Sequence, residues 1–395
     1  MNEDKVVPNI RFKGFEDEWK SYLLGKIAVF INGRAFKQNE LLDKGKYPVL
    51  RVGNFYTNDK WFYSDLKLPE KLYANKGDLL YTWSATFGPH LWKGDKVIYH
   101  YHIWKIIFSS EVSKQFALQM LLNDKEELMN NTNGSTMIHL TKNEMEKKLV
   151  KIPIKQEQQN IGNFFSKLDK LLDLQQQKID KLELLKKALL QKLFPKHDSK
   201  VPELRFKGYD QEWEEKKFSS LYKKCNEKNN LSFGSNKIIS VANMYYKKDN
   251  VKSDDNYMRT YNIFRLGDIA FEGNKSKKFT FGRFVENTIG DGIVSHVFEV
   301  FRPISNGDIT YWKYAIHNED FIAPVLMKST VKATMMNNLI AKDFLKQQVP
   351  VPQLSEQQKI GNLLSKVDQL IELENRKLQN FQQVKKCLLQ NMFVD

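Results

Sequence analysis

Hydrophobic residues recur at alternating spacings of four and three along two long segments, residues 157–194 and 356–393. This spacing is typical of one apolar stripe on a helix that packs against another helix in a coiled coil. No proline interrupts either segment, so the pattern predicts two unbroken helices of about 38 residues, each about 57 Å long. The predicted packing positions are Ile161, Phe165, Leu168, Leu172, Ile179, Leu182 and Leu189 in the first helix, and Ile360, Leu364, Val367, Ile371, Leu378, Phe381 and Leu388 in the second.

Polar residues interrupt both stripes at matching places. Gln175 and Lys186 in the first helix correspond to Glu374 and Lys385 in the second. A polar residue in such a stripe lowers stability but can fix register or orientation. A lone amphipathic helix of this length leaves its stripe in water. We therefore expect the two helices to pack antiparallel, related by a pseudo-two-fold axis, with homodimerisation through the same stripes as the open alternative.

The flanking residues predict where these helices begin and end. Prolines at 153, 350 and 352 favour extended backbone just before each helix. Ser355 and Gln358 have the spacing of a capping box, whereas Gln156 stands at the corresponding cap position of the first copy. Pro195 is expected to end the first helix, and residues 196–200 to form a solvated linker.

The helices belong to a larger repeat. Residues 7–19 read VPNIRFKGFEDEW and residues 201–213 read VPELRFKGYDQEW, while EQQNIGN at 157–163 returns as EQQKIGN at 356–362. The middles diverge and keep only echoes, such as VGNFY at 52–56 and VANMY at 241–245, and Gly-Asp at 77–78 and 267–268. A gene duplication without functional meaning explains the similar ends but not why the middles alone diverged. Similar end segments around different middles suit a protein that makes the same kind of contact to two different targets. The order of the repeat also predicts that the two termini lie close together.

The divergent middles are predicted to mix strands and helices. β-Branched and aromatic residues dominate the short runs 47–52, 78–83, 97–108, 237–241, 268–271 and 293–301, whereas 113–129 and 306–327 are more helical. We therefore predict an α+β protein with two globular domains joined by two long helices. The expected segments are a first domain at 1–150, a helical spacer at 151–195, a linker and second domain at 196–348, and a second helical spacer at 349–395.

The net charge of the chain indicates which kind of partner to expect. Lys and Arg number 62 against 47 Asp and Glu, a net charge of +15, which favours a polyanion such as nucleic acid or an anionic membrane surface. No apolar run approaches a membrane span, and residues 1–20 are too polar for a secretory signal. Cys225 and Cys387 are isolated, so we expect neither a disulfide framework nor a zinc site, and a cytoplasmic location fits.

Polar loops beside the predicted strands are the candidate contacts to DNA. Glycine lets backbone N–H groups approach phosphate, Ser, Thr and Lys satisfy phosphate oxygens, and Asn and Arg can read base edges. The same residue types also dominate ordinary turns. The candidates are Arg34, Arg51, Asn54, Thr82, Ser84, Thr86, Asn133, Ser135 and Thr136 in the first domain, and Ser240, Asn243, Asn274, Lys275, Lys277, Arg283, Lys332 and Thr334 in the second.

Catalytic motifs are missing from the sequence. There is no GxxxxGK[ST] nucleotide loop, no pair of adjacent prolines as in the N-P-P-Y motif for adenine methylation, and no Pro-Asp step as in PD-(D/E)xK nucleases. His90, His100, His102 and His296 have no carboxylate or cysteine at metal-binding spacing, and His100 and His296 fall inside strand-like runs. We expect no catalytic site, no bound cofactor and no metal.

Taken together, the repeated openings, the EQQNIG and EQQKIG motifs after Pro153 and Pro352, and the helix ends LLQKLF and LLQNMF resemble the specificity subunit of type I restriction–modification systems. The resemblance covers essentially the whole chain. It implies two target-recognition domains that read the halves of a bipartite sequence in double-stranded DNA. It implies helices that set the unread gap and dock two methylation subunits. S-adenosylmethionine, ATP and magnesium would then belong to the methylation and restriction subunits of the complex.

Two other classes of function stay open. A duplicated coiled-coil adaptor that binds proteins rather than DNA explains the helices and the repeat, but not the basic charge or the lysine-rich loops. A DNA methyltransferase or nuclease in its own right explains the charge, but the sequence lacks the motifs of both.

Overall fold

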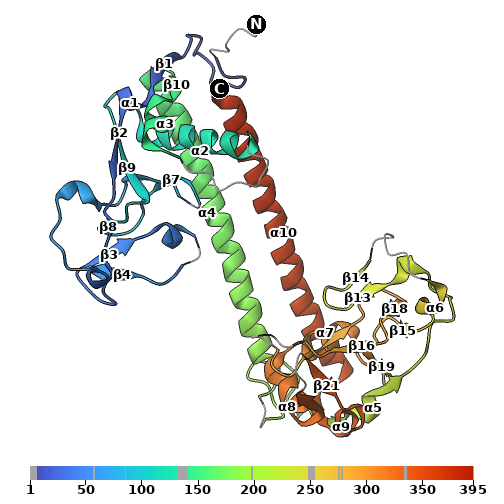
Figure 1. Ribbon diagram of the computed structural model, residues 1–395. Helices are drawn as coiled ribbons and strands as arrows, with labels where there is room; N and C mark the ends of the chain where they lie inside the picture. The colour runs from blue at the N-terminus through green and yellow to red at the C-terminus, as the bar shows by residue number, and fades with distance from the viewer. Residues whose placement is uncertain are drawn as a thin grey trace. The chain divides into compact units, whose positions relative to one another are not determined.

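The computed structural model describes residues 7–394 except 57, 85, 132–139, 197–198, 248–253, 275, 277–278 and 333–335. They form two compact units (Figure 1). Unit 1 comprises Met1–Gln176 and Arg376–Asp395, and unit 2 comprises Gln177–Asn375. Each unit holds one globular domain, called here the first and the second domain, together with part of both long helices. Each unit is therefore built from both halves of the sequence.

The two predicted helices are confirmed as α4 (Lys155–Lys192) and α10 (Leu354–Met392). Each helix continues from one unit into the other. Every predicted packing position on them is buried or partly buried, and Phe165 and Leu364 are fully buried. None of the helices that the structure describes is long and apolar enough to cross a membrane.

The helices run antiparallel in unit 1. Phe165 of α4 packs against Phe393, just beyond the end of α10, at 6.1 Å between ring centroids. Four residues further along α4, Asp169 pairs with Lys385, which lies earlier in α10 (2.5 Å between Oδ1 and Nζ). Positions therefore rise along one helix as they fall along the other, as predicted.

The same direction holds in unit 2. Lys178 of α4 pairs with Glu374 of α10 at 2.9 Å, and Lys186 pairs with Asp368 at 2.5 Å. Three of the predicted polar interruptions thus make ion pairs with the facing helix. They neutralise charge at positions that are otherwise apolar.

The predicted helix starts need correction. α10 begins at Leu354, and the carbonyl of Gln353 accepts the N–H groups of Glu356 and Gln357 at 2.9 and 3.0 Å. Ser355 therefore lies inside the first turn, and its predicted role as N-cap is wrong. Gln156 lies inside α4 in the same way, and α4 ends three residues before Pro195.

Both domains contain an antiparallel sheet with the same strand order. This sheet therefore has one topology in both divergent middles despite their different sequences. In the first domain the order is β2 (Ala28–Asn32), β9 (Ile103–Phe108), β6 (Leu79–Thr82), β7 (Gly88–Leu91), and in the second it is β12 (Tyr222–Cys225), β19 (Glu299–Pro303), β16 (Ile269–Glu272), β17 (Arg283–Glu286).

Smaller sheets complete each domain. Both domains also contain parallel pairings, among them Val49 with Ile98 in the first domain and Ile238 with Ile293 in the second. The strands are β4 (Phe62–Ser64), β3 (Tyr47–Leu50), β8 (Val97–Tyr99) and β5 (Tyr73–Ala74) in the first domain, and β13 (Ile239–Ser240), β14 (Tyr245–Tyr246), β15 (Asn262–Phe264), β18 (Gly292–Val294), β20 (Thr330–Lys332) and β21 (Asn337–Leu339) in the second.

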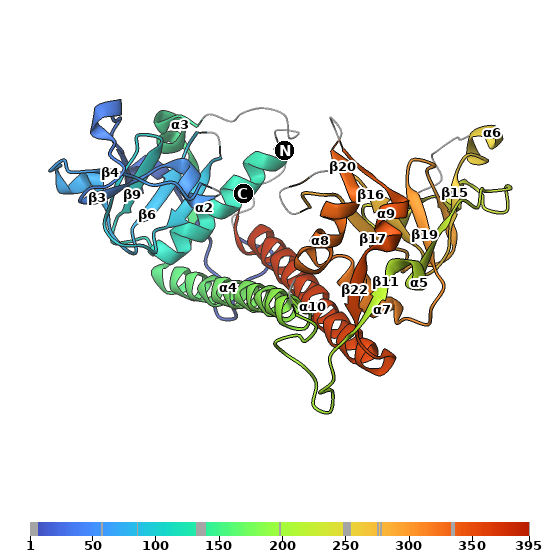
Figure 2. The same ribbon diagram turned by 90° about the horizontal axis from the view of Figure 1, so that it is seen from below.

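Two further two-stranded sheets and the other helices complete the two domains. Two-stranded sheets form from β1 (Lys20–Leu23) with β10 (Leu149–Ile152), and from β11 (Glu214–Lys217) with β22 (Gln348–Val351). Figure 2 shows α2 beside the first part of α4. The other helices are α1 (Leu24–Ile27), α2 (Lys114–Asn131) and α3 (Lys142–Lys147) in the first domain, and α5 (Phe218–Leu221), α6 (Asp255–Met258), α7 (Ile309–Ala315), α8 (Glu319–Ser329) and α9 (Ala341–Lys346) in the second.

The repeated glutamate of the EQQ motif fastens each opening segment to a helix. Glu157 is fully buried and accepts hydrogen bonds from Arg11 at 2.7 and 2.8 Å. Glu356 is bound by Arg205 in the same way at 2.8 and 3.0 Å. Each is a bidentate charge-assisted pair, the strong form of hydrogen bond. The RFKG and EQQ motifs therefore recur together because they form one joint.

The glutamine that follows each of these glutamates, and the glycine four residues beyond it, complete this joint. In unit 1, Gln158 donates to the Pro153 carbonyl at 2.9 Å and accepts the N–H of Ser113, just before α2, at 2.8 Å. Gln357 repeats both contacts at the start of α7. At Gly162 a Cβ would lie 2.9 Å from the Phe116 backbone nitrogen. Glycine here permits α2 to approach α4 closely.

The tryptophan of each repeated opening packs against the phenylalanine that follows the end of a long helix. Trp19 packs against Phe393 in unit 1, and Trp213 against Phe194 in unit 2, both edge to face. The N–H of Ile10 also donates to the carbonyl of Asn391 at 2.8 Å. Segments near the two ends of the sequence therefore lie together, as predicted.

Candidate nucleic-acid interface

The candidate loops of the second domain come together around the hairpin β16·β17. Arg283 donates to the carbonyl of Ala242 at 3.1 Å, which joins the hairpin to the turn that carries Asn243. Asn337 at the start of β21 binds the carbonyls of Gly273 and Thr280, at 2.8 and 3.0 Å. Since β21 pairs with β20 at Thr330–Lys332, the described parts of the predicted loops at 240–243, 272–283 and 328–334 lie next to one another.

Arg283 is held on several sides. Its Nε and Nη2 both lie 2.6 Å from Oε2 of Glu272, and its Cζ lies 5.2 Å from the ring centroid of Phe279. Glu272 is only 8% exposed, so this carboxylate lies inside the domain and faces the arginine. The guanidinium is thus ordered before any ligand arrives.

The candidate loops of the first domain surround the turn between β8 and β9. The N–H of Arg34 donates to the carbonyl of Tyr99 at 3.1 Å, and the N–H of His100 donates to the carbonyl of Leu50, the residue before Arg51, at 2.9 Å. The N–H of Trp83 donates to the His102 carbonyl at 3.2 Å. Three loops that are distant in sequence thus meet at this turn.

This turn carries aromatic residues that the sequence prediction missed. Tyr101 is 39% exposed, and its ring lies 3.9 Å from that of His102 and 6.1 Å from that of Trp83. His100 was predicted within a strand but lies at the turn, as does His296 in the second domain. The alternation YHYH between two strand-like runs was the available signal. Exposed rings beside arginines suit contact with DNA bases and sugars.

The two arginines of this surface differ in their partners. Both Nη atoms of Arg34 bind Glu40, at 3.1 and 2.7 Å, and this pairing, with the Lys37 N–H, lowers the pKa of the Glu40 carboxyl. Arg51 lies over the ring of Phe62 at 5.4 Å and makes no ion pair among the described residues. The guanidinium of Arg51 is therefore more available than that of Arg34.

The equivalent asparagines of the VGNFY and VANMY echoes also differ. The side chain of Asn54 accepts the N–H of Arg51 at 3.0 Å and donates to the carbonyls of Asn58 and Lys60, both at 3.1 Å. It is fully used within its own loop. Asn243 is exposed, and its amide makes no hydrogen bond among the described residues.

The remaining candidates occupy varied places. Thr82 is fully buried, and its hydroxyl donates to the Gly88 carbonyl, so its side chain does not reach the surface. Ser84 and Ser240 are partly buried, and Thr86, Asn274 and Lys332 are exposed. Six predicted contacts lie outside the described residues: Asn133, Ser135, Thr136, Lys275, Lys277 and Thr334.

Two histidines of the first domain are neutral at ordinary pH. Burial lowers the pKa of His90 to about 4, and the ring stacks on Phe55 at 4.0 Å between centroids. Burial, followed by the charges of His102 and Arg51, lowers the pKa of His100 to about 4. Within the part of the chain that the structure describes, no group of His, Cys, Asp and Glu residues could hold a metal ion.

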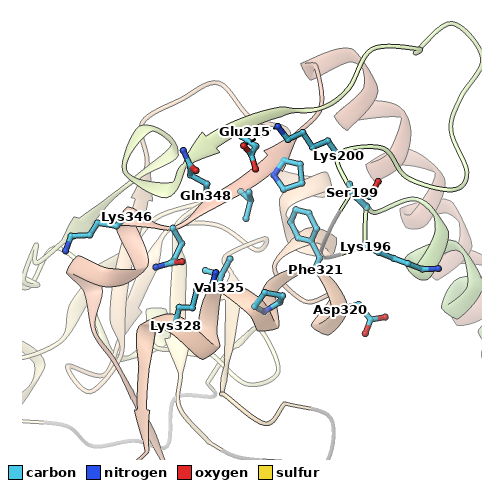
Figure 3. A pocket seen from close by; sticks show the side chains of 15 residues that line it. Lys196, Ser199, Lys200, Glu215, Asp320, Phe321, Val325, Lys328, Lys346 and Gln348 are labelled. Atoms are coloured by element: carbon cyan, nitrogen blue, oxygen red, sulfur yellow. Dashed lines mark ion pairs between the residues drawn. The ribbon is translucent and has the colours of Figure 1, made fainter.

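A pocket in unit 2 lies beside β22 and includes Lys328, the first residue of the predicted loop at 328–334 (Figure 3). It has a volume of about 430 Å³, and its lining includes four lysines, Lys196, Lys200, Lys328 and Lys346. Glu215 and Asp320 also line it, and Lys200 pairs with Glu215 at 3.3 Å. This mixed charge makes the pocket a surface hollow without the features of a catalytic or anion-binding site.

Comparisons with known proteins agree with this architecture. Residues 16–184 and 210–383 each match the model of the type I restriction modification DNA specificity domain. The type I restriction enzyme MjaVIII specificity subunit of Methanocaldococcus jannaschii is 22% identical over 94% of this chain and 91% of its own.

Two solved structures share the fold. The type I restriction–modification S subunit from M. genitalium has a TM-score of 0.60 at 15% identity, covering 98% of this chain and 99% of that one. A chain from a study of assembly and conformational transition of the type I restriction–modification system has a TM-score of 0.56 at 14% identity, covering 95% and 97%. With both of its repeats matched by the family model, the chain belongs to the type I restriction–modification DNA specificity family.

Proposed function

We propose that this chain gives a type I restriction–modification complex its sequence specificity by reading a bipartite DNA target, one half with each domain. The observation that carries the proposal is the pairing of one sheet topology with two different loop sets. Sheets of the same topology would present the loops of both domains to DNA in the same manner. Because the loop sequences differ, the two domains would read different bases. Catalysis would belong to the methylation and restriction subunits.

Different groups would supply affinity and specificity. The net charge of +15 favours attraction to phosphate that weakens with salt. Arg51 in the first domain and Arg283 with Asn243 in the second have the chemistry to read guanine and adenine edges. The exposed Lys332 is better suited to a phosphate contact, because an ammonium is a compact charge without a planar fork.

Exposed apolar side chains on the long helices of each unit are the proposed docking surface for a methylation subunit. These side chains lie on the long helices outside the packed stripe, and they are between 42% and 53% exposed. The leucine patch of unit 1 comprises Leu171, Leu174 and Val384, and that of unit 2 comprises the duplicated positions Leu370, Leu373 and Leu185. Exposed apolar patches mark interaction sites. Equivalent patches suit two copies of one partner.

The proposal is tested by expressing the chain with its methylation subunits and mapping methylated adenines across the host genome. We expect a single motif of two short sequences separated by a fixed unread gap. Replacing the second domain with that of a relative should change one half of the motif only. Methylation at a contiguous motif, or a change in both halves after the exchange, would contradict the proposal.

A further inference from the structure

We propose that Glu272 is a specificity-determining positioning residue of the second domain. It orders Arg283, and through Arg283 the turn that carries Asn243, so that both side chains meet a base pair of the half-site in a fixed arrangement. The inference rests on the proposed function. It adds a residue that makes no contact with DNA itself.

The position of Glu272 in the hairpin supports this role. Glu272 and Arg283 are directly opposite each other and form the last paired positions of β16 and β17 before the hairpin tip. A single oxygen, Oε2, receives both Nε and Nη2 of the arginine at 2.6 Å. The Nη1 group of Arg283 makes no hydrogen bond to any described residue. Its two N–H groups are therefore available to a ligand.

The same arginine fixes the neighbouring turn. Its Nη2 also donates to the carbonyl of Ala242 at 3.1 Å, one residue before Asn243. The next residue, Met244, has a φ of +48°, a left-handed conformation that a methionine adopts only at a cost in energy. The N–H of Met244 donates to the Ser240 carbonyl at 2.8 Å. This strained turn is thus held by the hydrogen bonds around it, including the one from Arg283.

The ordered turn presents the side chain of Asn243 as a second group that can read a base. Its side chain is exposed and makes no hydrogen bond within the described part of the chain, whereas the equivalent Asn54 uses its whole amide inside its own loop. An asparagine amide can bind N6 and N7 of adenine together, and an arginine amine can bind the O6 or N7 acceptor of guanine. The second domain therefore presents two side chains that can read bases, Arg283 and Asn243. Glu272 orders the first directly and the second through Arg283.

Removing the charge of Glu272 should change specificity and non-specific attraction in opposite directions. An ordered arginine loses little rotamer freedom on binding, and its placement selects among bases. Once released, the same guanidinium can still bind phosphate, and the domain has lost one negative charge. Binding to random DNA should then hold or rise, while discrimination at the second half-site falls.

The test compares Glu272→Gln with Glu299→Gln in the complex with methylation subunits. Glu299 pairs with Lys224 at 2.9 Å on the same sheet, so the control removes an equal charge. Affinities are measured at one salt concentration for the cognate duplex and for duplexes altered at each base pair. We expect Glu272→Gln to lower discrimination about tenfold at one or two positions of the second half-site, and Glu299→Gln to leave it unchanged.

Two further variants keep the test decisive if Glu272→Gln folds poorly. Arg283→Lys retains the charge but loses the fork, and Asn243→Ala removes the second reader, so both should relax the same positions. Full discrimination in Glu272→Gln, or equal relaxation in Glu299→Gln, would overturn the inference while the proposed function stands. A wild-type complex that prefers no bipartite sequence would instead overturn the proposed function, and this inference with it.

Discussion

Lys385 of α10 reaches Asp169 of α4 at 2.5 Å within unit 1, and Lys186 reaches Asp368 at the same distance within unit 2. The two pairs occupy duplicated positions. Each lysine interrupts an apolar stripe, and each finds its carboxylate on the opposing helix. An ion pair at such a position favours one register, since a shifted helix leaves both charges without partners.

Reversing one charge tests this role. Lys385→Asp places two carboxylates together and should lower the free energy of unfolding by about 1–2 kcal/mol. Adding Asp169→Lys restores opposite charges and should recover most of the loss. Urea unfolding of the two single variants and the double variant gives the coupling. Strict additivity of the two changes would show that the pair makes no contribution.

The close approach of helices at the joints predicts the effect of a single methyl group. In Gly162→Ala, the Cβ would lie 2.9 Å from the backbone nitrogen of Phe116, and in Gly361→Ala it would lie 2.8 Å from that of Tyr311. Backbone cannot move aside cheaply, so each change should cost about 1–3 kcal/mol in thermal or urea unfolding. Gly234→Ala is the control, because its nearest neighbour would lie at 3.4 Å. Unchanged stability in Gly162→Ala would mean that the helices are free to separate.

His90 should make the stability of the first domain depend on pH. Its pKa is about 4 in the folded protein, against about 6.5 for an unperturbed histidine. Between these values the unfolded chain binds the extra proton, so the free energy of unfolding falls as pH drops from 6.5 to 4, by about 2–3 kcal/mol. In His90→Gln the dependence should become less steep by this amount in urea unfolding across this range, and the remainder should include the contribution of His100, whose pKa is also about 4. An equally steep dependence in the variant would assign it to other groups.

The leucine patches predict the stoichiometry of assembly. Leu171→Ser with Leu174→Ser should reduce the number of bound methylation subunits from two to one, and adding the changes at Leu370 and Leu373 should abolish binding. Native mass spectrometry of the purified complex counts the subunits. Leu184→Ser is the control, since this leucine is 67% exposed but its duplicated position is a glutamine. Loss of both subunits after the first pair of changes would refute independent docking.

The helices and their packed stripes were predictable because they depend on spacing within one segment. The ion pairs at Lys186 and Lys385 were foreshadowed by the interruption of those stripes. The capping role of Ser355 was predicted wrongly because the helix begins two residues earlier than that cap requires, at Leu354, after the carbonyl of Gln353. The two glutamates of the EQQ motifs are engaged by arginines about 150 residues away, which no local pattern reveals.

The candidate loops were found by composition, but their partners were not. Arg34 and Arg283 have the same side chain, yet Glu40 occupies the fork of one and Glu272 fixes the other from the side. Asn54 and Asn243 stand at matching places in a repeated motif, and only the fold shows that one amide is consumed by its loop. Residue type therefore gave only the candidates, while tertiary hydrogen bonds determine which of their side chains remain available.

The division of each long helix between two units has a consequence for synthesis on the ribosome. Unit 2 consists of one continuous stretch, Gln177–Asn375, so all of its contacts exist once that stretch has emerged. Unit 1 is completed later, because Trp19 and Phe116 pack against Phe393, which is translated after the whole of unit 2. The part encoded first is thus completed last, and its exposed aromatic surface is the one that a nascent-chain chaperone would meet.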